Sequence, residues 1–136
     1  MEKLTETNYV DLAENVIAKE IVRNPKRHNS IVLTTSKIRN LLSLTNTLYN
    51  DVIHLTEETL SDEILGKIQY LRLRFVYEAG RDTDREKSVK DFVEKADIIR
   101  HLKRIETRSD LLLFCRYMEA LVAYHKFNGG RDQGRK

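Results

Sequence analysis

The chain has 136 residues, of which 40% are hydrophobic and 33% are charged. This length is typical of one domain, and this balance excludes a largely disordered chain. No apolar run approaches the ~18–20 residues that cross a bilayer, and Glu2, Lys3 and Glu6 stand where a secretory signal would begin its apolar stretch. The single cysteine, Cys115, cannot form an internal disulfide. We therefore expect an intracellular, cytoplasmic domain with no membrane partner.

The net charge of +3 is distributed unevenly along the chain. Residues 126–136 contain four basic side chains and one acidic one, so the rest of the chain is neutral overall. Residues 21–50 contain no acidic residue, whereas residues 51–63 contain five acidic residues and no lysine or arginine. Mixed charge most often means solvated helix surface, but this segregation indicates local patches of opposite sign.

Apolar residues recur at helical spacing in five segments, which predicts an all-α, five-helix bundle in a single domain. The expected helices cover about residues 8–22, 35–54, 61–79, 83–105 and, from Thr107 or Ser109, as far as 127. Pro25 must end the first helix, because the residue before a proline disfavours helix, and a polar, basic loop follows over residues 24–30. Thr34 or Thr35 is the expected cap of the second helix.

Two further signals mark the later boundaries. Gly80 is the expected residue just past the third helix, and Thr83 with Glu86 forms a capping-box pattern at the start of the fourth. The domain is expected to span residues 1–128, with a basic, disordered tail over 129–136.

The residues that could support catalysis are few. Asp51 with His54, and Asp97 with His101, have ligand-like spacing on a helix, but neither pair has the second set of ligands that a di-iron bundle uses. Cys115 lies on the apolar stripe of the last helix, so we expect it to be a core residue rather than a nucleophile. We therefore expect no catalysis, no cofactor and no bound metal, and a small metalloenzyme is the least favoured hypothesis.

Cations and tyrosines alternate along one stripe of the third expected helix. Its members are Lys67, Tyr70, Arg74, Tyr77 and Arg81. The cations are about 10 Å apart along the helix axis, so they could meet every second or third phosphate of a nucleic-acid strand. The tyrosines would supply flat faces or hydroxyl donors between them. The alternative is that the tyrosines border the core and the cations are merely solvated.

The start of the second expected helix is also basic. We place Lys37 and Arg39 in its first turn, where the helix dipole is positive and cations are mildly disfavoured. Free amides together with two cations make an anion site, and the preceding loop adds Lys26, Arg27 and His28. The alternative is that solvent screening makes the unfavourable placement negligible.

With these features assembled, the sequence resembles the small subunit of type III-A (Csm) CRISPR interference complexes. The resemblance covers about residues 8–130 and depends on the order of several helical segments. These are LTTSKIRNLLSLTNTLYN at 33–50, KIQYLRLRFVYEAGRD at 67–82, VKDFV at 89–93 and FCRYMEALVAYHKFNGG at 114–130.

The resemblance implies a five-helix protein with no catalysis of its own, stacked in several copies as the inner filament of a ribonucleoprotein. Its implied partners are guide RNA and target RNA, the other subunits of the effector complex and copies of itself. Carried over by position, the RNA-binding residues are Lys37, Arg39, Lys67, Arg74, Arg81 and Arg131. The acidic segment 51–63 could meet basic segments of the next copy. A protein-only helical adapter is the alternative.

Overall fold

The helices account for most of the structure, a computed structural model that describes residues 1–132. The α-helices are α1 (Tyr9–Asn15), α2 (Thr35–Val52), α3 (Asp62–Arg81), α4 (Ser88–Lys95), α5 (Ile98–Lys103) and α6 (Arg108–Phe127). A π-helical turn, η1 (Val16–Glu20), continues α1. A hairpin of two-residue strands, β1 (Arg23–Asn24) and β2 (Ser30–Ile31), encloses the short 3-10 turn η2 (Pro25–Arg27). The all-α prediction is confirmed.

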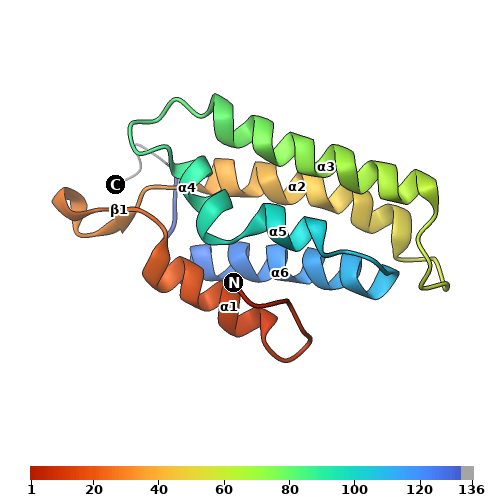
Figure 1. Cartoon of the computed structure of the whole chain (residues 1–136). Coiled ribbons are helices and arrows are strands. Elements are labelled where there is room, and N and C mark those ends of the chain that lie inside the picture. Colours follow the sequence, from red (N-terminus) through yellow and green to blue (C-terminus); the bar gives the residue numbers. More distant parts are fainter. Residues whose placement is uncertain (133–136) are drawn as a thin grey trace.

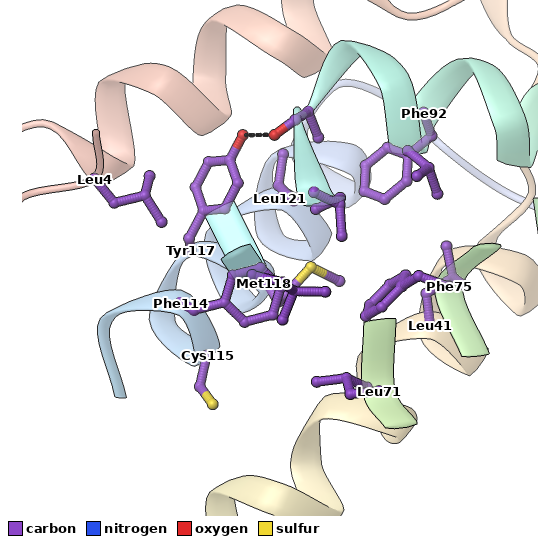
Figure 2. Close-up of a cluster of buried hydrophobic side chains, with 14 of the residues drawn as sticks. Leu4, Leu41, Leu71, Phe75, Phe92, Phe114, Cys115, Tyr117, Met118 and Leu121 are labelled. Carbon is purple, nitrogen blue, oxygen red and sulfur yellow. Dashed lines mark hydrogen bonds between the residues drawn. The ribbon is translucent and has the colours of Figure 1, made fainter. Parts of the chain in front are cut away.

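The long helix α6 lies at the centre of the bundle (Figure 1). It packs against α1 and against α2, while α3 packs against α2, α4 and α5. The rings of Phe75 on α3 and Phe114 on α6 meet edge to face, with centroids 6.4 Å apart. Figure 2 shows the fully buried Tyr117 in the same core, where its hydroxyl donates to the carbonyl of Ala96 at 2.8 Å.

Hydroxyl side chains start the three long helices. Thr34 accepts a hydrogen bond from the backbone of Lys37 at the start of α2, and Ser61 accepts one from the backbone of Ile64 at the start of α3. Thr107 and Asp110 form a reciprocal capping box at the start of α6. Of the two residues expected to cap the second helix, Thr34 rather than Thr35 does so, and the last helix begins after Thr107 rather than Ser109. By contrast, α3 continues through Gly80 instead of ending before it.

The single helix expected over residues 83–105 is wrong, because this segment forms α4 and α5. The capping box of Thr83 does not start the helix. Instead, the carboxylates of Asp84 and Asp82 accept hydrogen bonds from the backbone of Ser88 and of Val89, each at 2.9 Å. The break falls at Asp97, which has a left-handed backbone (φ 56°), a conformation that aspartate tolerates better than most residues.

The basic loop after Pro25 is the tip of the small hairpin. His28 and Asn29 have left-handed backbones (φ 58° and 56°), which reverse the chain so that Arg23 pairs with Ile31. In Figure 1 the hairpin projects at one end of the molecule, opposite the loop that joins α2 to α3.

After α6 the chain turns back toward α2. Gly129 has a left-handed backbone (φ 90°), and the amide of Gly130 donates to the carbonyl of His125 at 2.7 Å. Beyond this turn, the Asp132 carboxylate accepts from the amide and from the hydroxyl of Ser36, at 2.9 and 2.7 Å. Residues 129–132 of the expected tail therefore lie against the start of α2, and residues 133–136 lie outside the described residues.

Candidate nucleic-acid interface

Two hollows follow the seam where α2 and α3 lie side by side in antiparallel orientation, and a third lies beyond it, between the hairpin and the start of α2. A groove of about 660 Å³ is lined by Lys67, Tyr70 and Arg74. A smaller hollow of about 310 Å³ is lined by Arg81 and Lys37. A cleft of about 460 Å³ at the hairpin end is lined by Lys37, Arg131 and the loop cations Lys26 and Arg27. We call this line of five predicted residues the cationic seam: Lys67, Arg74, Arg81, Lys37 and Arg131.

Lys67 stands at the end of the cationic seam nearest the α2–α3 loop. Its ammonium lies 3.0 Å from the carboxylate of Asp51 on α2 and 3.6 Å from that of Glu63 on its own helix. The hydrogen bond to Asp51 is the main reason that the pKa of Lys67 is raised. Lys67 is exposed, so a phosphate that approaches it competes with two surface carboxylates.

Arg74 and Arg81 share one buried carboxylate. The Nη2 atom of Arg74 lies 3.3 Å from Glu78, and the Nε atom of Arg81 lies 2.9 Å from it. The ring of Tyr77 is 5.8 and 6.0 Å from the two guanidinium carbons, within the range of a cation–π contact. Tyr70 and Tyr77 are 60% and 58% exposed, so neither borders the core as the alternative hypothesis required.

Lys37 joins α2 to the loop between α3 and α4. Its ammonium lies 2.8 Å from Asp82 and 2.9 Å from Asp84. Burial lowers the pKa of Lys37, but the two carboxylates outweigh this effect and raise it. Burial alone would raise the pKa of Asp84, yet hydrogen bonds from Ser88 and Lys37 lower it to about 2. Lys37 therefore has a structural role in addition to any contact with a phosphate.

The other two predicted residues differ in their surroundings. Arg39 is exposed on α2 and lines none of the three hollows of the cationic seam. Arg131 is exposed at the cleft, where its backbone carbonyl accepts from the amide of Thr35 at 3.4 Å. The predicted anion site at the start of α2 thus holds the chain's own Asp132 carboxylate, which no sequence pattern indicated.

Glu78 is the second residue of the candidate site, after Asp132, that the sequence analysis did not predict. The signal was present, because Arg74 and Arg81 lie four residues before and three residues after it, the spacings at which helical side chains meet. Its burial, however, depends on how α3 packs against α2.

Of the candidate metal and nucleophile residues, Asp51 and Asp97 have other partners and His101 and Cys115 are buried, whereas His54 is exposed. Within residues 1–132, no three side chains of the His, Cys, Asp or Glu type gather in a metal-binding group. Asp97 pairs with the amino group of Met1 at 3.4 Å. Burial raises the pKa of the Cys115 thiol to about 12, so the thiolate is scarce near neutral pH. Cys115 is buried, as expected, and His125 is buried as well.

Comparison with known proteins identifies the family. The family model described as Csm2 Type III-A matches residues 7–131. The chain belongs to the Csm2 family of type III-A CRISPR systems. The "CRISPR system Cms protein Csm2" of Streptococcus thermophilus is 48% identical over 129 residues, which are 95% of this chain and 98% of that protein. The resemblance inferred from the sequence is therefore confirmed, and with it a place in CRISPR antiviral defence.

More distant Csm2 proteins match over similar spans. Proteins of the same name from Mycobacterium tuberculosis and Enterococcus italicus are 44% and 35% identical to this chain. Their matches cover 84% and 92% of this chain, and 90% and 96% of the relatives themselves. Among residues 1–132, none of the helices has the length and apolar character that crossing a bilayer requires.

Proposed function

We propose that this Csm2 chain is a non-catalytic small subunit of a cytoplasmic type III-A effector complex that contacts the backbones of guide and target RNA. The observation that supports this most strongly is the cationic seam, which gathers residues from α2, α3 and the segment after α6. Sequence specificity in such a complex can come from base pairing, so the protein has only to hold backbones. Arg39 would add a contact from the neighbouring exposed surface of α2.

The charge balance of the cationic seam suits weak contacts made by many copies. Lys67 and Lys37 each pair with two carboxylates, and Arg74 and Arg81 share one. A single chain should therefore bind RNA weakly and in a strongly salt-dependent manner. Several linked copies would bind much more tightly, because each contact after the first becomes intramolecular.

Stacking of copies is the second part of the proposal. The acidic segment 51–63 lies at the α2–α3 loop, and the basic hairpin lies at the opposite end of the molecule (Figure 1). Contacts between unlike ends repeat in one direction and build a filament. Arg108 stabilises the backbone at the acidic end, because its guanidinium donates to the carbonyls of Val52 and Ile53 at 3.0 and 2.8 Å.

A protein-only adapter is the competing proposal, and the outer surface of α3 favours it. Leu65, Leu73 and Val76 are 40%, 59% and 52% exposed there, which is unusual for apolar side chains on one helix. An adapter would use this surface for a protein neighbour and would have no RNA dependence.

The test is to replace Arg39, Arg74 and Arg81 by alanine together with Glu78→Gln, so that no buried carboxylate is left without its cations, and to measure RNA binding across salt concentrations. We expect unchanged helical content, weaker binding and a salt slope that is lower by about 0.7 for each phosphate that the variant no longer neutralises. Lys37 is left in place, because its removal would also disturb the fold. An unchanged slope, or a purified complex that nuclease treatment leaves intact and fully assembled, would favour the adapter.

A further inference from the structure

Glu78 is an acidic residue in the middle of a row of cations, and it is only 7% exposed. Its Oε1 atom accepts hydrogen bonds from Arg81 Nε at 2.9 Å and from Asn40 Nδ2 at 3.5 Å. Its Oε2 atom accepts from Arg74 Nη2 at 3.3 Å. A buried carboxylate is costly unless it is paired, and this one is paired with two arginines of the cationic seam.

The shared carboxylate brings two distant side chains together. Arg74 and Arg81 are separated by about 10 Å of helix rise. The Arg74 side chain extends toward the C-terminal end of α3 and the Arg81 side chain toward its N-terminal end. Arg74 therefore bonds to one carboxylate oxygen of Glu78 and Arg81 bonds to the other. Tyr77 lies against both groups and limits their movement on another side.

The guanidinium groups keep donors for a ligand. An arginine has five N–H donors, and each of these side chains makes one hydrogen bond to Glu78. Arg74 and Arg81 remain 38% and 58% exposed. Two guanidinium groups held close to each other suit neighbouring phosphates of one strand, which follow each other within a few ångströms.

We propose that Glu78 is a positioning residue, which holds Arg74 and Arg81 in place for neighbouring phosphates of one RNA strand. This inference rests on the proposed function, in which the cationic seam contacts RNA. Charge counting alone gives the opposite expectation, because removal of an acidic residue raises the positive field and should strengthen binding to a polyanion.

The two expectations are separated by a matched pair of variants of the 136-residue chain, Glu78→Gln and Glu63→Gln. Both remove one negative charge from α3 beside a cation of the seam. We measure binding of a fluorescently labelled single-stranded RNA at several salt concentrations. Glu63→Gln should bind slightly more tightly. Glu78→Gln should bind several-fold more weakly, with a salt slope lower by about 0.7 for each phosphate that Arg74 or Arg81 no longer reaches.

A third variant has the same net charge as the wild type. Glu78→Asp keeps the charge but shortens the side chain, so it cannot reach both arginines, and it too should bind more weakly. Thermal unfolding shows that each variant is folded. The Arg81 Nε–H resonance in NMR spectra should exchange slowly with water in the wild type and rapidly in Glu78→Gln.

The outcomes separate the two ideas. If the wild type binds RNA but Glu78→Gln and Glu78→Asp bind at least as tightly, the positioning role is wrong and the proposed function stands. An Arg81 resonance that does not change in Glu78→Gln also overturns the positioning role. If neither the wild type nor Glu63→Gln binds RNA at low salt, the proposed function itself is overturned, and the positioning role with it.

Discussion

His101 shows how a single buried side chain makes stability depend on pH. It is 3% exposed on α5, where its ring meets that of Tyr117 edge to face at 5.1 Å. Burial is the main cause that lowers the pKa of His101 to about 4, and the positive charges of Arg104 and the amino terminus act in the same direction. Asp97 opposes them without reversing the shift. The folded protein therefore keeps this imidazole neutral at pH values where an unfolded chain would protonate it.

The first prediction concerns the free energy of unfolding between pH 7 and pH 4. Because the folded pKa is below the unfolded value of about 6.5, the stabilisation is complete above that value and is lost as the pH falls toward 4. We expect a loss of up to about 3 kcal/mol from His101, since one pKa unit corresponds to about 1.4 kcal/mol. His101→Gln should flatten the pH profile in urea unfolding measurements. An equally steep profile in this variant would contradict the assignment.

Two glycines in different parts of the chain have opposite roles. A Cβ atom built on Gly130 would lie 2.1 Å from the Cε1 atom of His125, whose ring Nε2 lies 2.6 Å from the carbonyl oxygen of Leu33. A Cβ atom on Gly66, in the interior of α3, would meet nothing within 4 Å. Gly130 is therefore required by close packing, whereas Gly66 is not required by the packing of the chain itself.

The second prediction is that substitution by alanine has opposite effects on the free energy of unfolding at these two positions. Gly130→Ala should lower the free energy of unfolding by about 1–3 kcal/mol, because the buried imidazole has to move. Gly66→Ala should raise it by about 0.5–1 kcal/mol, since alanine loses less backbone freedom in a helix. Thermal unfolding of the two variants in parallel provides the measurement. If Gly66→Ala were less stable than the wild type, something other than close packing would have to require glycine at this position of α3.

Among the helices, α2 is joined by ion pairs to α3 at one end and to the loop after α3 at the other. Lys37 bonds to Asp82 and Asp84 at one end, and Asp51 bonds to Lys67 at the other. Asp82 is buried, and it also accepts from the amide of Val89 at the start of α4. Lys37 therefore supports the junction of three helices, a role that a purely RNA-binding residue would not have.

The third prediction compares two cations of α2. Lys37→Ala should lower the free energy of unfolding by about 1–3 kcal/mol, because it leaves the buried carboxylate of Asp82 without its charged partner. Arg39→Ala should change stability by less than about 0.5 kcal/mol, since Arg39 is exposed. Urea unfolding at neutral pH distinguishes them. Equal stability of the two variants would mean that the ion pairs of Lys37 make no net contribution to the free energy of unfolding.

At the scale of the whole molecule, charge is divided between the two ends. The side chains of Glu57 and Glu58 are exposed at the α2–α3 loop, and Lys26 and Arg27 are exposed at the hairpin. Unlike ends attract over a distance of about 10 Å at moderate salt, and higher salt screens this attraction. This division of charge is what the proposed head-to-tail contact between copies depends on.

The fourth prediction is that Glu57→Lys with Glu58→Lys weakens stacking of copies, while the isolated chain stays folded. Sedimentation of the purified chain, or the copy number in the assembled complex, measures this effect at low salt. Assembly should weaken further as salt is raised in the wild type. Unchanged assembly of the reversed variant would count against contact through this end.

The sequence by itself determined the helical class, most helix boundaries and the family, and it narrowed the start of the second and last helices to two candidate residues each. These features are local, because helical periodicity and capping depend on a few neighbouring residues. The separation of acidic and basic segments was likewise evident, since it depends only on order along the chain. The Glu78 pairs could also have been predicted, from their helical spacing.

Only the tertiary structure decided which cations are paired and where the fourth expected helix breaks. Lys37 meets carboxylates 45 and 47 positions away, and Asp132 meets Ser36 across 96 positions. The segment breaks where Tyr117 of α6 donates to the carbonyl of Ala96, next to the left-handed Asp97. Such contacts depend on how distant segments pack in space. A charge pattern therefore shows where cations are, but the fold decides how much of their charge remains for the proposed contact with RNA.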